Sequence, residues 1–209
     1  MKPFAAPLAL APFLALAACG PPTPAGLHVA PASPSASLSS GTAVERYFPL
    51  VDGRVYHYAT SNDRGDPGVL VAHVRRTEAA SGELRFPASA RRFRYEADGV
   101  VTFSKIGAAA YVLKEPLAQG TTWVGEHGGT TTISAVGARL DTPAGHFDAC
   151  VVTTERTSGP APVRYETTLC PGTGIVVLEV QSGQSLERAT LQGYGEPVSI
   201  GAEGLQRLP

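Results

Sequence analysis

The feature that most constrains the fold of this chain is a series of short segments in which apolar and polar residues alternate. The clearest is 91–96, where Phe93 and Tyr95 fall on one face of an extended strand and charged residues fall on the other. Turn signals rich in glycine, proline, asparagine and aspartate separate such segments roughly every ten residues. This spacing predicts antiparallel strands joined by tight turns.

Nine segments have this character, and no helical periodicity appears from Val44 onward. The expected strands are 54–60, 69–76, 91–96, 100–106, 130–136, 149–156, 163–170, 174–180 and 185–192. The 23 glycines and 18 prolines suit many turns better than long helices. We therefore predict a mainly β fold, a single curved antiparallel sheet that forms a half-barrel or open barrel.

The first 18 residues are predicted to be a secretory signal peptide. A positive charge at Lys2 precedes an apolar run that is shorter than the roughly 20 residues a membrane-spanning helix needs. Leu16-Ala17-Ala18-Cys19 closes this run and resembles the lipobox of bacterial lipoproteins. The resemblance implies a mature chain that begins at Cys19, is acylated there and is held on the extracytoplasmic side of a membrane. Gly20 rather than aspartate follows the cysteine, which implies the outer membrane if the host is Gram-negative.

Three further segments follow the signal peptide. Residues 19–43 are rich in proline and serine and predict a disordered, lipid-anchored linker. Residues 44–193 are expected to form the β domain, and 194–209 a C-terminal tail. The whole chain carries 17 basic and 18 acidic side chains, so its charge gives no reason to expect nucleic acid as a partner.

Two cysteines lie on consecutive expected strands. Cys150 and Cys170 are each ten residues from Pro160, so a hairpin that turns there places them opposite each other. We predict a cross-strand disulfide, which an oxidising compartment would favour. A pair of buried thiols and a metal or redox pair are the alternatives, although no Cys-x-x-Cys motif is present.

Several strings resemble those of a group of secreted bacterial lipoproteins. The matches to "YFPL…G…W.Y", "PL..G..W", "TPAG.F" and "PG.G.V" are residues 47–58, 116–123, 142–147 and 171–176. Tyr56 stands where tryptophan is usual in this group. The group is the TapB-like domains, and the resemblance implies a strongly curved antiparallel sheet, distantly similar to the half-barrels of LolA and LolB. It implies no catalytic residues.

Candidate residues for catalysis or metal binding occur only in pairs. The pairs are His57 with His73, His146 with Asp148, and Glu126 with His127. A zinc site needs three or four converging ligands and a hydrolytic site needs a nucleophile, a base and an orienting group. The sequence therefore predicts no metal site, no cofactor and no catalytic residues.

Four arginines are candidates for an anion-binding patch. Arg75, Arg76, Arg92 and Arg94 lie on neighbouring expected strands and could meet anionic lipid or an acidic polymer. The alternative is a solvated sheet face in which these charges pair with nearby glutamates.

These observations favour a non-catalytic binding or assembly module of the cell envelope. Its expected partners are the membrane, through the N-terminal lipid, and a lipid, hydrophobic peptide or envelope protein. The alternative is an extracytoplasmic hydrolase or metal-dependent enzyme that uses the histidines and acids named above.

The lipid anchor gives the first testable prediction. Replacing the acylated thiol by Cys19→Ala should move the protein out of the membrane fraction, because a 15-residue apolar run cannot span the bilayer. Metabolic labelling with a radioactive fatty acid and membrane fractionation measure the change. Unaltered labelling and fractionation of the variant would show that Cys19 carries no lipid.

Overall fold

Twelve strands form one antiparallel sheet in the computed structural model, which describes residues 42–104, 107–196, 198–201 and 204–207. The strands lie in the order β6-β5-β4-β3-β2-β1-β12-β11-β10-β9-β8-β7. Their bounds are β1 (Val55–Ser61), β2 (Gly68–Glu78), β3 (Ser81–Phe86), β4 (Ser89–Glu96), β5 (Gly99–Phe103), β6 (Ala109–Lys114), β7 (Thr122–Val124), β8 (Thr130–Thr142), β9 (Gly145–Arg156), β10 (Val163–Cys170), β11 (Gly174–Ser182) and β12 (Ser185–Gly195). The predicted mainly β class and single curved sheet are confirmed.

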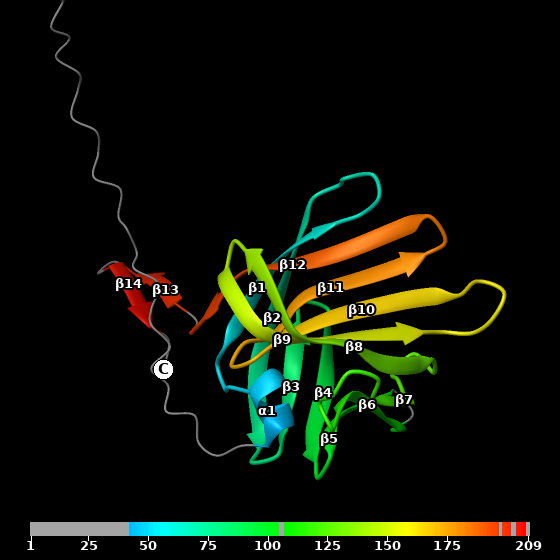
Figure 1. The fold of residues 1–209 in the computed structure, drawn as a ribbon. Coiled ribbons are helices and arrows are strands. Elements are labelled where there is room, and N and C mark those ends of the chain that lie inside the picture. Colours follow the sequence, from blue (N-terminus) through cyan, green and yellow to red (C-terminus); the bar gives the residue numbers. More distant parts are fainter. Residues whose placement is uncertain (1–41, 105–106, 197, 202–203, 208–209) are drawn as a thin grey trace, which may run out of the picture. The chain divides into compact units, whose positions relative to one another are not determined.

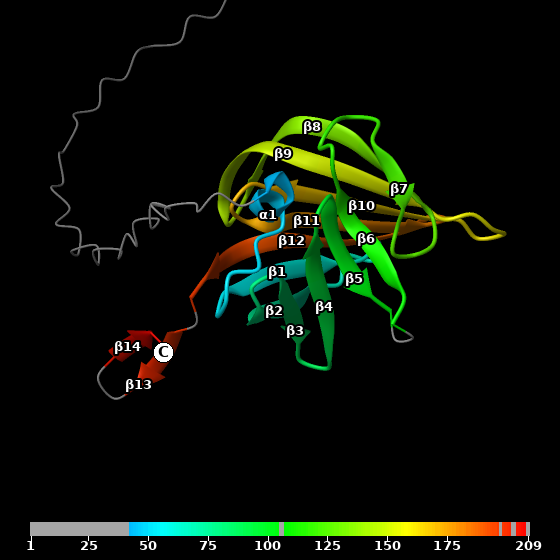
Figure 2. The same ribbon diagram turned by 90° about the horizontal axis from the view of Figure 1, so that it is seen from below.

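The sheet curls until its two edge strands approach each other (Figures 1 and 2). The result is a barrel that is nearly closed, with one seam between β6 and β7. At the seam the Trp123 indole Nε1–H of β7 donates a hydrogen bond of 3.1 Å to the Tyr111 carbonyl of β6. A tryptophan side chain thus bridges the seam in place of a ladder of backbone bonds.

All nine expected strands are present in the twelve-stranded sheet, and three more strands of this sheet were not expected. The three are β3, β6 and β7. The most instructive is β3, because its first two residues, Ser81 and Gly82, have the composition of a loop. Two short strands, β13 (Val198–Gly201) and β14 (Gly204–Arg207), pair with each other as a separate sheet within the segment expected as a tail. The predicted signal peptide, linker and Cys19 lie outside the described residues.

A short helix, α1 (Ala43–Tyr47), precedes the barrel. The Thr42 side chain accepts a hydrogen bond from the Glu45 amide, as an N-terminal cap does, and Val44 is buried. The helix contacts β5, β10 and β11, so it lies against both halves of the sheet. Among the described residues no helix is long and apolar enough to cross a membrane.

The segment after α1 enters the barrel. Phe48 packs on Phe93 of β4 with ring centroids 4.9 Å apart. The Tyr95 hydroxyl donates to the Phe48 carbonyl and accepts from the Leu50 amide, both at 2.8 Å. Burial raises the pKa of Tyr95 to about 12, so its phenol stays protonated and keeps this pair of bonds. The N-terminal segment is therefore fixed inside the sheet and forms part of the barrel's interior.

The hairpin of β9 and β10 has the predicted register. Val151 faces Leu169 and Thr153 faces Thr167. Cys150 and Cys170 are joined by a disulfide, with their Cα atoms 4.2 Å apart, and both are fully buried. The cross-strand disulfide is thereby confirmed.

The disulfide gives a stability prediction. A double variant, Cys150→Ala with Cys170→Ala, frees a loop of 20 residues in the unfolded chain and should lower the free energy of unfolding by about 3 kcal/mol. Urea denaturation followed by Trp123 fluorescence measures the loss. Wild-type protein unfolded with a reducing agent should show a similar loss; equal midpoints for oxidised, reduced and variant protein would contradict the prediction.

Candidate functional site

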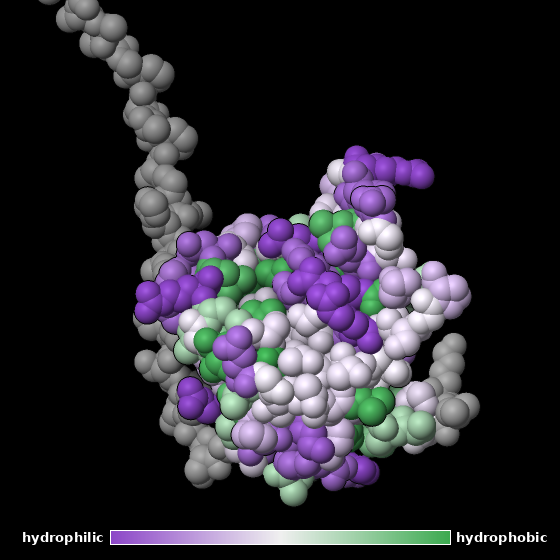
Figure 3. All heavy atoms as spheres, turned by 45° about the vertical axis from the view of Figure 1, so that its right-hand side comes forward, coloured by the Kyte–Doolittle hydropathy of each residue, from purple (hydrophilic) through white to green (hydrophobic). Residues whose placement is uncertain are grey.

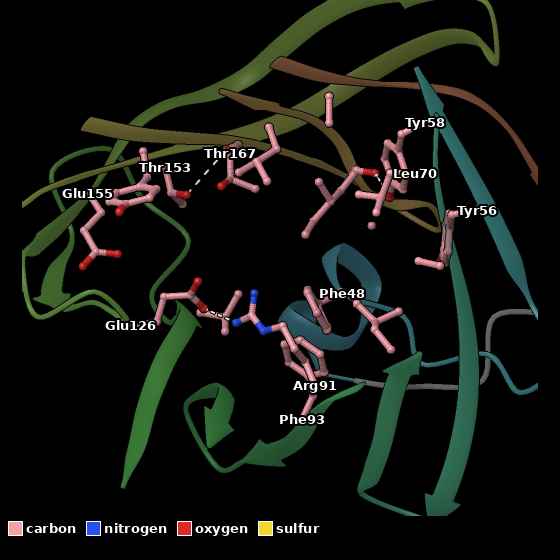
Figure 4. A pocket seen from close by; sticks show the side chains of 18 of the residues that line it. Phe48, Tyr56, Tyr58, Leu70, Arg91, Phe93, Glu126, Thr153, Glu155 and Thr167 are labelled. Carbon is pink, nitrogen blue, oxygen red and sulfur yellow. Dashed lines mark hydrogen bonds and ion pairs between the residues drawn. The ribbon is translucent and has the colours of Figure 1, made fainter. Parts of the chain in front are cut away.

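The barrel holds a partly open cavity of about 250 Å³. Strands from both halves of the sheet and the segment after α1 line it, and most of its walls are apolar (Figure 4). On the face of the molecule drawn in Figure 3, hydrophobic side chains occur in small groups between polar ones. The cavity is thus the place where apolar surface is gathered around an open space.

One end of the cavity is walled by aromatic and aliphatic side chains. Tyr56 and Tyr58 of β1 turn their rings toward the space, near Leu70 of β2 (Figure 4). Their hydroxyls donate to the carbonyls of Thr173 and Ile175, at 2.7 and 2.9 Å. Burial raises the pKa of both tyrosines, so they stay neutral and act as apolar walls.

The other end is polar and is built around Glu155 of β9. Strand register places Glu155 between Thr131 of β8 and Tyr165 of β10, all on the inner face. Glu155 is only 6% exposed, yet its carboxylate is well supplied with donors. Its Oε1 accepts from the amides of His127 and Gly129, at 2.9 and 3.0 Å. This buried carboxylate therefore holds the β7–β8 loop against the barrel.

His127 of that loop lies flat on the Tyr165 ring, with centroids 3.6 Å apart and planes 2° from parallel. Its Nδ1 is 2.9 Å from Glu155 Oε2, and its Nε2 is 3.2 Å from Glu126 Oε1. Both ring nitrogens therefore face carboxylates. The second carboxylate, of Glu126, also pairs with the Arg91 guanidinium of β4, which points toward it (Figure 4).

Thr131 differs from the other polar residues at this end of the cavity, because its side chain makes no hydrogen bond in the described structure. It is 4% exposed and lines the cavity, but its hydroxyl has no hydrogen-bond partner among the described residues. Gly125 brings the loop so close that a side chain there would clash with both the Thr131 hydroxyl and the Glu155 carboxylate. The loop thus packs tightly against these two groups and still leaves the hydroxyl without a partner.

The four predicted patch arginines do not share one face. Arg75 and Arg92 align through Glu83 between them, and Arg92 and Glu83 form an ion pair of 3.5 Å. Arg94 pairs with Glu96 at 2.5 Å. Arg76 instead donates to the carbonyls of Glu78, Ala79 and Leu50. The structure thus brings three of the four onto the outer face, with acidic neighbours, and an anion-binding role for them stays a prediction.

The other sequence candidates are separate from the cavity, apart from Glu126 and His127. His57 and His73 are exposed on the outside of the sheet. His146 lies between Asp141 and Asp148, with Nδ1–Oδ1 and Nε2–Oδ2 distances of 2.6 and 3.3 Å. The hydrogen bond with Asp141 and the charge of Asp148 raise the pKa of His146 above its usual value. In the described part of the chain no three histidine, cysteine or acidic side chains converge as metal ligands would.

Sequence reasoning missed Thr131, Glu155 and Arg91 as cavity residues. A signal for Glu155 is present, because it continues the odd-numbered, inward-facing series of Val151 and Thr153. A charged residue in such a series is a candidate functional group. The pairing of Arg91 with Glu126 has no such signal, since it spans the seam between strands far apart in the sequence.

No family model and no curated protein matches the sequence, so the resemblance to TapB-like domains stays a prediction. Two solved structures are similar. A protein designated a lipoprotein from Parabacteroides distasonis has 14% identity and a TM-score of 0.48, over 71% of this chain and 98% of its own. A protein designated as exported, with a YmcC-like fold, from Bacteroides fragilis has 13% identity and a TM-score of 0.49, over 72% and 99%.

The unpartnered hydroxyl gives a prediction. Thr131→Val removes a buried polar atom without changing the shape of the side chain, so it should raise the free energy of unfolding of the empty protein by about 1 kcal/mol. Thr102→Val is the matched control, because the equally buried Thr102 hydroxyl donates to the Arg92 carbonyl at 3.0 Å. The control should lose about 1 kcal/mol in urea denaturation. A loss of the same size in both variants would mean that Thr131 has a partner within the protein.

Proposed function

We propose that this protein is an envelope lipoprotein whose barrel binds a hydrophobic or amphiphilic small molecule, without covalent chemistry. The observation that carries the proposal is the cavity, which has aromatic and aliphatic walls at one end and converging polar groups at the other. Ligand sites combine these two properties, with apolar walls for affinity and a few polar groups for orientation. A barrel built only for stability would fill this space with side chains.

The size of the cavity favours a ligand with one hydrocarbon chain. About 250 Å³ lies just below the usual range of about 300–1,000 Å³ for small-molecule pockets. A volume of this size suits one hydrocarbon chain better than two acyl chains side by side. A single-chain lipid or a comparable amphiphile matches both the volume and the shape.

The geometry gives less support to a hydrolase. A serine-type mechanism needs a base nitrogen in contact with the nucleophile's hydroxyl. Here both ring nitrogens of His127 face carboxylates, and the Thr131 hydroxyl has no hydrogen bond to either. The polar end is thus arranged to hold a group rather than to activate a nucleophile.

The proposed location of the protein in the cell envelope rests on its N-terminal sequence. The lipobox-like Leu16-Ala17-Ala18-Cys19 and the proline- and serine-rich linker would hold the barrel near a membrane on its extracytoplasmic side, the outer membrane if the host is Gram-negative. The linker of 19–43 would reach about 75 Å when extended. The resemblance to TapB-like and LolA/LolB-type sheets agrees with a binding or assembly role there, in which an envelope protein could also take part.

Native mass spectrometry tests this function. The full-length protein extracted from its host in mild detergent should carry a bound small molecule. Ala189 is buried and lines the cavity, so Ala189→Phe fills part of the space and should reduce the bound fraction at least about tenfold. Ala59→Phe is the matched control, because Ala59 lies on the neighbouring strand and is exposed.

The control separates cavity binding from lipid carried on the surface. Circular dichroism should show that both variants keep the β fold. Loss of the bound mass in Ala189→Phe alone supports the proposal. Equal retention in both variants would place the molecule outside the cavity and contradict it, as would a protein that never carries a ligand under any extraction.

A further inference from the structure

The cavity is most exposed to solvent at its polar end. Among the described residues that line it, the exposed ones are Arg91 of β4 and His127 of the β7–β8 loop. The side chains of Arg91 and His127 are 43% and 34% exposed, whereas Phe48 and Tyr56 at the apolar end are buried. The route from solvent into the cavity therefore runs past Arg91 and His127, and the aromatic walls form its deep end.

Glu126 connects these two exposed side chains. Its Oε2 pairs with the Arg91 guanidinium, which points toward it in Figure 4, and its Oε1 lies 3.2 Å from Nε2 of His127. The His127 ring in turn lies on the Tyr165 ring of β10, with centroids 3.6 Å apart. A chain of side-chain contacts thus runs from β4, on one side of the seam, to β10 on the other.

The two ends of this chain are held with unequal strength. On the β10 side the loop is fixed by the buried Glu155 carboxylate, which accepts from two loop amides and contacts Nδ1 of His127. On the β4 side, the described residues are joined by the ion pair of Arg91 and Glu126, whose side chains are both partly exposed. Ion pairs with this exposure are weak, because water stabilises the separated charges. The chain therefore breaks most easily between Arg91 and Glu126.

We propose that Arg91, Glu126 and His127 form a latch across the opening of the cavity, and that the latch opens when the ion pair of Arg91 and Glu126 breaks. The ligand then enters with its apolar end first, because apolar and aromatic side chains line the deep end (Figure 4). This inference rests on the proposed function, since it concerns the same cavity. It goes further because it names the residues that control how fast the ligand is exchanged.

A latch controls the rates of binding rather than the affinity. An ion pair that has to open for both entry and exit changes the two rate constants by the same factor and leaves their ratio unchanged. Stopped-flow fluorescence with N-phenyl-1-naphthylamine measures association, because the emission of this apolar probe increases when it leaves water. Displacement by excess 1-octanol gives the dissociation rate. The protein is the full-length chain with Cys19→Ala, made by cell-free synthesis so that it is not acylated.

Removal of the charge tests the ion pair. Glu126→Gln should raise both rate constants several-fold. Glu179→Gln is the matched control, because Glu179 pairs with Arg188 at 3.3 Å and its side chain is 26% exposed, close to the 21% of Glu126. Glu179 is absent from the lining of the cavity, so the control should leave both rates unchanged. Equal rates in the two variants would overturn the latch.

A covalent bridge tests the same contact in the opposite direction. In the double variant Arg91→Cys with Glu126→Cys, a short bis-maleimide joins the two introduced thiols, while Cys150 and Cys170 are bonded to each other and do not react. The bridged protein should exchange the probe at least about tenfold more slowly in both directions. The control is the same double variant with each thiol capped separately by N-ethylmaleimide. It lacks both the ion pair and the bridge, so it should exchange the probe as fast as Glu126→Gln does.

The outcomes separate this inference from the proposed function. Circular dichroism should show the β fold in every variant, and Ala189→Phe should greatly weaken probe binding, which places the probe in the cavity. Equal rates in the bridged and capped proteins would then overturn the latch and leave the binding site standing. If the parent protein does not bind the probe, or Ala189→Phe binds it equally well, the proposed function fails and the latch fails with it.

Discussion

The cavity depends on how the two edges of a twelve-stranded sheet are brought together. An unpaired edge exposes a row of backbone donors and acceptors, and full closure is the usual way to remove it. Here β6 and β7 approach without a backbone ladder, and side chains make the connection. The Trp123 indole bonds to the Tyr111 carbonyl, and farther along, the Arg91 guanidinium of β4 pairs with Glu126 beyond the end of β7. This seam, connected by side chains, lies beside the polar end of the cavity.

Glu155 shows how this barrel keeps a charge in its interior. Transfer of a lone carboxylate into an apolar interior is very unfavourable, and hydrogen bonds to the ionised form are what make it tolerable. The amides of His127 and Gly129 and the imidazole of His127 provide them. The same bonds also fix the five-residue loop between β7 and β8, whose glycine-rich sequence offers few apolar side chains for packing. Glycine at 125 and 129 lets the backbone come close enough for these bonds.

Sequence alternation predicted the sheet well, and the hairpin argument placed Cys150 opposite Cys170 in the observed register. The strand prediction from alternation failed where a tertiary contact overrides the local composition of the sequence. Gly82 suggests a turn, yet it lies inside β3, where its missing side chain leaves room for Leu50 of the N-terminal segment. The five-residue helix α1 is too short to show a periodicity and is defined by its Thr42 cap and its contacts with the barrel.

The candidate site was less predictable for a related reason. Glu126 and His127 stand out as adjacent titratable residues, but their role depends on Arg91 and Glu155, which reach them across the barrel. Strand alternation tells which residues point inward and says nothing about which inward residues meet, because that depends on the curvature and closure of the sheet. Glu155 and Thr131 could be placed on the inner face from their strands. Their shared proximity to Gly125 follows only from the folded loop.

The polar network is incomplete at Thr131, whose hydroxyl has no partner among the described residues. Stability alone would favour valine over threonine at position 131, since a hydroxyl without a partner weakens the folded state. The same reasoning applies to the cavity itself, whose walls lose packing contacts until something occupies them. An amphiphile bound in this cavity would restore those contacts.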